Sequence, residues 1–195
     1  MSWFLGELMP YVAIAVLVLG VAYRALRWAK MPPHFRWTLY PYPRTPTGQI
    51  GFIAGELLTF RSLRKANRGM WLGAWTFHIS MVVIVLGLVL LTAGAGAVVV
   101  SIGFAGLMFG SIYLLVFRLA VRRMRLLTTG VEVLHLALFI GIGLTGLGAA
   151  LGGVSLVDAQ AYLRGLVTFS PAAAPAQPVF MALLVLVEIF LLYFA

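Results

Sequence analysis

Five long runs of apolar residues divide this chain, and they constrain its fold more than any other feature. A membrane-spanning helix needs about 20 consecutive, mostly apolar residues, and five stretches of this kind occur in the 195-residue sequence. We therefore predict an all-α integral membrane protein, a single domain over residues 1–195 built as a bundle of five transmembrane helices. The expected spans are residues 7–28, 71–92, 95–117, 128–151 and 178–195.

The composition excludes a soluble enzyme. Hydrophobic residues make up 63% of the chain and charged residues 10%, whereas soluble domains have about 45–50% and about 25%. The chain has no cysteine, so it cannot by itself hold a thiolate-bound zinc or a cysteine-bound iron–sulfur cluster.

The positive charges indicate how the chain crosses the membrane. Nine of the 14 Lys and Arg residues lie between Arg24 and Arg68, and four lie between Arg118 and Arg125. They separate the apolar runs instead of alternating with exposed aromatic residues, so we expect no nucleic-acid partner. Because Lys and Arg accumulate in cytoplasmic loops, we predict a multi-pass protein of the inner (cytoplasmic) membrane. Its N-terminus would lie outside and the end of its last span inside.

The longest basic segment, residues 29–70, is expected to lie on the cytoplasmic side and to include an interfacial helix. Five prolines prevent regular helix in its first half: Pro32, Pro33, Pro41, Pro43 and Pro46. Apolar residues from Ile50 to Leu63 then share one side of a predicted helix whose other side carries Arg61, Arg64 and Lys65. Such a helix can lie on anionic lipid or dock a soluble partner subunit, and the sequence leaves both open.

Two histidines fall within the predicted spans. His78 and His135 each lie about seven residues into a run that we expect to start at the cytoplasmic side, which places both about 10 Å deep at about 1.5 Å per residue. Two imidazoles at one depth could bind the two faces of a haem iron. Alternatively, each could hydrogen-bond a neighbouring helix. Zinc fits less well, because no third ligand lies clearly at that depth. His34, in the basic segment, is predicted to be an ordinary interfacial residue.

Two acidic residues also fall within the predicted spans. Glu188, about ten residues into the last run, could exchange a proton with a quinone or bond another helix as a neutral acid. Glu132, three residues before His135, is a second candidate for such a quinone or proton site; it could also orient a ligand or pair with a basic loop. Small residues in the second and fourth runs could make room for a porphyrin or simply pack helices together: Gly73, Ala74, Gly87, Gly141, Gly143, Gly146 and Gly148.

Several segments resemble a known family. The five expected spans and the motif Trp71-Leu72-Gly73-Ala74-Trp75-Thr76-Phe77-His78 resemble the membrane cytochrome b subunits of the respiratory nitrate reductase gamma type. The nearest variants are the membrane subunits of heterodisulfide reductase and of the dissimilatory sulfite-reduction complex. Two further segments are similar: Arg118–Gly146, with its Thr128-Thr129-Gly130 and Thr145-Gly146 motifs, and Tyr162–Pro171.

The resemblance implies oxidation of a quinol and transfer of electrons through b haems to an iron–sulfur subunit at the cytoplasmic face. His78 matches the first haem ligand of the family. Leu88 stands where the family has another histidine, and Met181 or Ala182 stands near the place of that histidine's outer partner. We therefore expect no outer haem and one haem b. The family's remaining ligand falls just beyond Ala195.

Two ligation schemes follow for this haem: His78 with His135, which we favour, or His78 with a residue beyond Ala195. The expected function is a membrane-anchoring cytochrome b subunit of a respiratory redox complex. It would transfer electrons between a quinone pool and an iron–sulfur partner on the cytoplasmic face, and would not act as a stand-alone enzyme. The alternative is a haem-free membrane anchor of such a complex. A transporter or channel is less favoured, because no internal repeat is evident.

Overall fold

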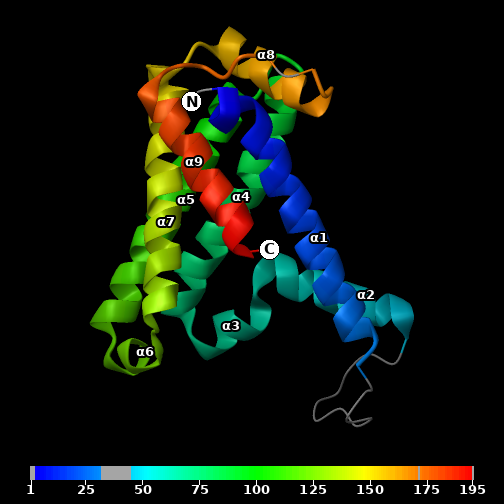
Figure 1. Ribbon diagram of the computed structural model, residues 1–195. Coiled ribbons are helices and arrows are strands. Elements are labelled where there is room, and N and C mark those ends of the chain that lie inside the picture. The colour runs from blue at the N-terminus through cyan, green and yellow to red at the C-terminus, as the bar shows by residue number, and fades with distance from the viewer. Residues whose placement is uncertain (1–2, 32–44, 171, 195) are drawn as a thin grey trace.

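The chain forms a bundle of helices. The computed structural model describes residues 3–31, 45–170 and 172–194, and the regular structure among them is helical, as predicted (Figure 1). His34 and the first four prolines of the basic segment lie outside the described residues. The elements are η1 (Phe4–Leu8), α1 (Met9–Ala29), α2 (Pro46–Thr59), α3 (Arg61–Ala66), α4 (Arg68–Thr92), α5 (Ala97–Ala120), α6 (Arg122–Leu127), α7 (Gly130–Gly148), η2 (Ala149–Gly153), α8 (Leu156–Val167) and α9 (Pro178–Phe194).

Within the described part of the chain, four helical segments are long and apolar enough to cross a membrane. They are Phe4–Ala29, Arg68–Thr92, Ala97–Ala120 and Gly130–Gly152, and they correspond to the first four predicted spans. The fifth predicted span is also an apolar helix, α9, but it has 17 residues. At about 1.5 Å per residue, α9 is about 25 Å long, slightly less than the thickness of the hydrocarbon layer.

Helices α4, α5 and α7 form the centre of the bundle. Helices α4 and α5 are antiparallel and are joined by a short turn at Gly94 and Gly96, whose φ angles of 89° and 93° suit glycine. Helix α7 packs on the other side of α5, and α9 packs on α7 and α1. Apolar side chains fill the space between the three central helices: Ala74, Phe77, Val100, Phe104, Leu107, Leu114, Leu136, Phe139 and Ile142.

Glycines let these helices approach closely, so the packing interpretation of the small residues is the right one for four of them. A Cβ atom on Gly87 would lie 2.6 Å from the Val100 nitrogen, and one on Gly143 would lie 2.9 Å from the Met108 nitrogen. Gly73 and Gly146 would collide with side chains of α5 in the same way. These four positions are filled by neighbouring protein and leave no room there for a porphyrin.

The basic segment contains two helices where the sequence predicted one. Phe60 adopts a left-handed conformation, with φ of 46°, and separates α2 from α3. The break is stabilised by Glu56, whose carboxylate accepts hydrogen bonds from the Ser62 amide (3.0 Å) and hydroxyl (2.7 Å). The prediction of one continuous amphipathic helix is therefore wrong at Phe60. Arg61, Arg64 and Lys65 all follow the break, on α3, so they cannot form the polar side of α2.

Helix α8 lies across the end of the bundle opposite the basic segments (Figure 1). Its residues fall between the predicted spans 128–151 and 178–195, where the sequence analysis predicted no helix. The Tyr11 hydroxyl donates to the Leu166 carbonyl at 3.1 Å, and the Tyr162 hydroxyl donates to the Gly6 carbonyl at 2.6 Å. Arg164 also donates to the Thr92 carbonyl. These bonds connect α8 to the N-terminal helix and to the end of α4.

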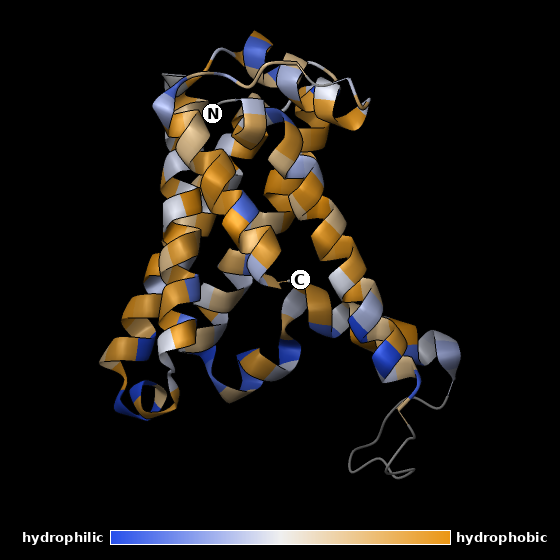
Figure 2. Ribbon diagram, in the orientation of Figure 1, coloured by the Kyte–Doolittle hydropathy of each residue, from blue (hydrophilic) through white to orange (hydrophobic). Residues whose placement is uncertain are grey.

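The surface of the bundle is apolar, as lipid-facing helices require. Figure 2 shows hydrophobic residues around the long helices and hydrophilic residues concentrated towards the two ends. Val82 and Val85 on α4 are 61% and 62% exposed, and Leu144 on α7 is 60% exposed. A water-soluble bundle would bury such residues, so the structure supports a multi-pass membrane protein.

Candidate functional site

His78 is held by its own helix. It lies on α4, and its Nδ1 atom is 2.7 Å from the Ala74 carbonyl oxygen one turn earlier. Because a carbonyl oxygen can only accept, Nδ1 carries a hydrogen, and Nε2 is therefore the atom with the lone pair in the neutral imidazole. The imidazole contacts the rings of Phe60 and Phe77 at centroid distances of 4.8 and 5.0 Å. This arrangement presents Nε2 as a fixed ligand atom for a metal.

His135 lies on α7 against the end of α9. Its imidazole is 4.7 Å from the ring of Tyr193 and 5.2 Å from the ring of Phe194. Its Nε2 atom is buried and has no hydrogen-bond partner among the described residues. Leaving a buried polar atom unpaired costs free energy, and a ligand bound to this nitrogen would remove that cost. The alternative of a hydrogen bond from Nε2 to a neighbouring helix is not realised within the described chain.

Aromatic contacts connect the two histidines. Phe77 touches His78 and packs edge-on against Phe139. Phe139 lies one turn beyond His135 on α7. From Phe139 the contacts continue through Phe190 to Phe194, at centroid distances of 4.8 and 4.6 Å. We call this group the inner aromatic cluster. Among the described residues, the two imidazoles belong to this cluster but do not contact each other. Its members are Phe60, Phe77, His78, His135, Phe139, Phe190, Tyr193 and Phe194.

The two imidazoles are candidate axial ligands of a haem, and the packed rings of Phe77 and Phe139 lie in the chain of contacts that joins them. Each imidazole offers an Nε2 atom free of hydrogen bonds, on two helices that run in the same direction (Figure 1). Aromatic side chains provide the apolar surroundings that a porphyrin requires. The described residues contain no group of three or more His, Cys, Asp or Glu side chains that could hold a metal ion. The donor set therefore suits a haem iron, which takes one or two axial protein ligands, better than a zinc ion, which takes three or four.

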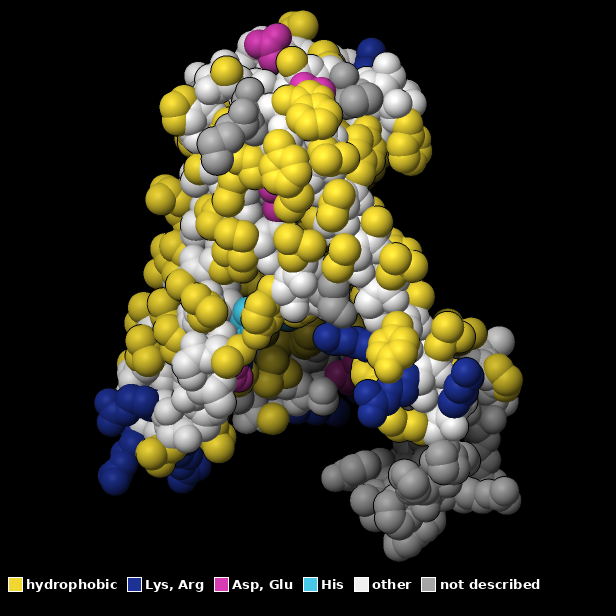
Figure 3. Space-filling view, viewed as in Figure 1, with side chains coloured by type: hydrophobic (Ala, Val, Ile, Leu, Met, Phe, Trp, Pro, Cys, Tyr) yellow, Lys and Arg dark blue, Asp and Glu magenta, His cyan; other side chains and the backbone are white. Residues whose placement is uncertain are grey.

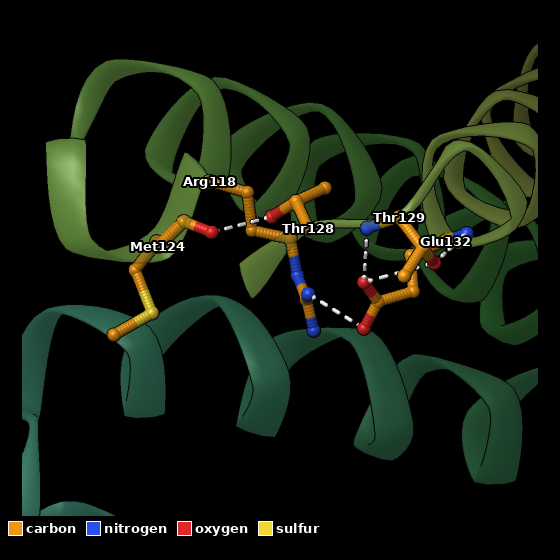
Figure 4. Close-up of polar contacts among 5 residues, drawn as sticks. All are labelled: Arg118, Met124, Thr128, Thr129 and Glu132. Atoms are coloured by element: carbon orange, nitrogen blue, oxygen red, sulfur yellow. Dashed lines mark hydrogen bonds and ion pairs between the residues drawn. The ribbon is translucent and has the colours of Figure 1, made fainter. Parts of the chain in front are cut away.

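Glu132 is engaged in holding the start of α7 (Figure 4). Its carboxylate accepts a hydrogen bond from the Thr129 amide at 2.8 Å, while the Thr129 hydroxyl accepts one from the Glu132 amide at 3.3 Å. This reciprocal pair is a capping box. The other carboxylate oxygen forms an ion pair with Arg118 of α5 at 2.9 Å. Of the two roles that the sequence allowed, Glu132 therefore has the pairing with a basic residue.

Glu188 lies apart from Glu132, on the inward side of α9. It is 5% exposed, and its Oε1 atom is buried without a hydrogen-bond partner among the described residues. The carboxyl group lines a cavity of about 470 Å³ whose other lining residues come mainly from α1, α4, α5, α7, α8 and α9. Almost all of these residues are apolar. The sequence alone identified Glu188 as unusual, but it gave no indication of the cavity.

Tyr162 is a wall residue of this cavity that the sequence analysis missed. It is 1% exposed and belongs to α8. Burial, followed by the nearby Glu188 carboxyl, raises the pKa of the Tyr162 hydroxyl above its ordinary value. Its ring also packs edge-on against Phe180 at 5.5 Å. Tyr162 belongs to the segment Tyr162–Pro171 that resembles the family, but its place in the cavity wall depends on α8, which the sequence did not predict.

Most of the described Lys and Arg residues gather at one end of the molecule, which we call the basic end. Figure 3 shows them at the bottom of the view, around a hollow between the bundle and the end of α1. Of the described basic residues, Arg164 is the exception, because it lies on α8 at the opposite end. The basic end comprises Arg24, Arg27, Lys30, Arg61, Arg64, Lys65, Arg68, Arg118, Arg122, Arg123 and Arg125.

Comparison with known proteins supports the family resemblance. The chain is similar to a protein of Archaeoglobus fulgidus named Hdr-like menaquinol oxidoreductase cytochrome b-like subunit, with 29% identity over 111 residues. The match covers 42% of this chain and 33% of the relative, so the chain spans about a third of that protein's length. No family model matches the chain. The relative is a cytochrome b-like membrane subunit, which is the kind of protein that the Trp71–His78 motif resembles.

Proposed function

We propose that this chain is an electron-transfer subunit of a membrane oxidoreductase complex, exchanging electrons with a quinone pool. The observation that carries the proposal is the pair of histidines in the inner aromatic cluster, each with Nε2 free for a ligand. The similarity to the Archaeoglobus protein, which is named as a menaquinol oxidoreductase subunit, supports the same assignment.

His78 and His135 would be the axial ligands of one haem b near the cytoplasmic side. A haem bound there supplies reversible one-electron chemistry. The Ala74 carbonyl fixes the orientation of the His78 ring, and aromatic rings pack against both imidazoles. No outer haem is proposed, because Leu88 stands where the family has its second histidine, and leucine cannot bind iron.

The basic end would face the cytoplasm. By the positive-inside rule, α3 and α6 would then lie on the inner side and α8 on the outer side. We propose that α9 completes five spans, with its short length accommodated by local thinning of the bilayer. The basic end would also attract anionic lipid and an iron–sulfur or other redox subunit that carries acidic residues.

Haem analysis of the purified full chain tests the proposal. We expect one haem b per chain, with a reduced-minus-oxidised spectrum of the b type. The variants His78→Ala and His135→Ala should each lose most of the bound haem. The matched control is His34→Ala, which changes the third histidine of the chain and should keep the full haem content.

Other outcomes would redirect the proposal. Full haem content in His135→Ala would reject that residue as a ligand and favour a partner for His78 beyond Ala195. Absence of haem from the intact chain, purified with its partner subunits, would overturn the electron-transfer role and favour a haem-free membrane anchor.

A further inference from the structure

The cavity beside Glu188 has the properties of a binding site for a lipid-soluble molecule. Its volume of about 470 Å³ lies within the range of about 300–1,000 Å³ that is usual for small-molecule sites. Its walls are apolar side chains, with the Glu188 carboxyl as the charged or acidic exception. An apolar cavity with one inward polar group favours a ligand that is mostly hydrocarbon and carries a single hydrogen-bonding atom at a fixed place.

The carboxyl group of Glu188 needs such a partner. It is 95% buried, and its Oε1 atom makes no hydrogen bond with any described residue. Burying a polar group without a partner is unfavourable. An acyl chain would fill the cavity but would leave Oε1 unpaired. A ring with a carbonyl or hydroxyl oxygen would fill the cavity and pair the carboxyl as well.

The cavity opens towards lipid. Ile14 on α1 and Val85 on α4 both line it, and they are 50% and 62% exposed on the outside of the bundle. Helix α1 packs on α9 and not closely on α4, so the space between Ile14 and Val85 is not closed by packing of these two helices. A molecule dissolved in the membrane can therefore enter without passing through water.

The cavity also adjoins the histidines through a shared wall. Phe139 and Phe190 line the cavity and belong to the inner aromatic cluster. Phe139 contacts Phe77, the sequence neighbour of His78, and Phe190 contacts Phe194, which touches His135. These ring contacts form a continuous path from the cavity wall to the two imidazoles. Leu88, at the position where the resembling family has a second histidine, lies in the wall as well.

We propose that this cavity binds the ring of a quinone, with a ring oxygen hydrogen-bonded to Glu188 and the ring against Phe139 and Phe190. The lipophilic character of the ligand follows from the cavity itself, whereas its identity as a redox-active quinone rests on the proposed function. The site lies on the side of the aromatic wall away from the basic end.

Infrared difference spectroscopy with a labelled quinone tests this site. The probe is menadione, a naphthoquinone without an isoprenoid tail, labelled with ¹³C at its carbonyl groups. The full chain is held in phosphatidylcholine nanodiscs. We expect saturable binding and a carbonyl band shifted by hydrogen bonding. Glu188→Leu should lose the shift and bind about 2- to 10-fold more weakly, while Glu188→Gln should keep a shifted band because its amide can donate.

Two further variants control the experiment. Ala150→Phe places a ring in the cavity, whose wall includes Ala150, and should abolish saturable binding. Glu7→Leu removes a different acid, on η1, that does not line the cavity, and should bind menadione as the unmodified protein does. Circular dichroism and thermal unfolding establish that each variant is folded. If Ala150→Phe fails to fold, the Glu188→Leu and Glu188→Gln pair decides the question.

Two results would overturn the proposal: an unchanged carbonyl band in Glu188→Leu, or no saturable binding of menadione to the folded protein, which would mean that lipid chains fill the cavity. Haem content is measured on the same samples. Menadione binding in a protein without haem would support this site and contradict the proposed electron transfer. Haem in a protein that does not bind menadione would support electron transfer and contradict this site.

Discussion

Gly110 of α5 offers a quantitative test of the helix packing that positions His78. A Cβ atom at this position would lie 2.8 Å from the Phe77 nitrogen and 3.0 Å from its Cα atom. These are backbone atoms of α4, which cannot rotate away, so Gly110→Ala requires α4 to move by about half an ångström against a closely packed core. Gly141 on α7 provides a matched substitution. Its added Cβ atom would meet the tip of the flexible Leu186 side chain at 3.2 Å.

The two substitutions share the same gain in helix propensity, up to about 1 kcal/mol. Only Gly110→Ala carries the additional cost of overpacking, about 1–3 kcal/mol. We therefore expect Gly110→Ala to be the less stable variant by about 1–3 kcal/mol, which corresponds to a melting temperature lower by about 2–4 °C for each kcal/mol. Thermal unfolding in detergent, followed by circular dichroism, measures the difference. Equal melting temperatures, or a higher one for Gly110→Ala, would refute the packing argument.

Three further predictions concern a helix cap, a buried tyrosine and the junction between two helices. Thr129→Ala should remove the capping box of α7 and cost about 0.5–2 kcal/mol, whereas Thr128→Ala, whose hydroxyl only donates to the Met124 carbonyl, should cost less in the same unfolding assay. Burial raises the pKa of the Tyr162 hydroxyl. The stability that this neutral hydroxyl contributes is therefore complete below about pH 10 and declines as the pH rises towards the folded pKa. Tyr162→Phe should remove this loss of stability at alkaline pH. The hydrogen bonds from Ser62 hold the pKa of the Glu56 carboxyl below its usual value, so the junction between α2 and α3 should be intact above about pH 4.3 and loosen as the pH falls through the folded pKa. Hydrogen exchange at the Ser62 amide should report that loosening, and Glu56→Ala, which removes the acceptor of that amide, should show fast exchange throughout.

The sequence predicted the bundle well because its signals are long and repeated. Runs of about 20 apolar residues have few structural alternatives, and the first four matched helices that begin and end within a few residues of the expected bounds. The break at Phe60 was not predictable from side-chain periodicity, because it depends on the Glu56 carboxylate capturing Ser62. Helix α8 was missed because it is short and of mixed polarity, and its stability comes from contacts with distant residues such as Gly6.

For the candidate site, the sequence identified residue types but not their surroundings. His78, His135 and Glu188 were recognisable because ionisable side chains are rare in apolar helices. The aromatic cluster and the cavity arise from α4, α7 and α9 coming together, and no local pattern encodes that meeting. For Glu132, the sequence likewise identified the residue type but not the partners of its carboxylate. It shares a helix with His135, yet Arg118 and Thr129 occupy its carboxylate.

Low-temperature electron paramagnetic resonance of the oxidised full chain tests the central claim most directly, because the spectrum distinguishes the axial ligands of a low-spin haem. The unmodified protein should show ligation by two imidazoles, and both His78→Met and His135→Met should replace that signal with one typical of mixed histidine and methionine ligation, with a raised reduction potential. A two-imidazole signal that persists in His135→Met would contradict the assignment of these two histidines to one iron.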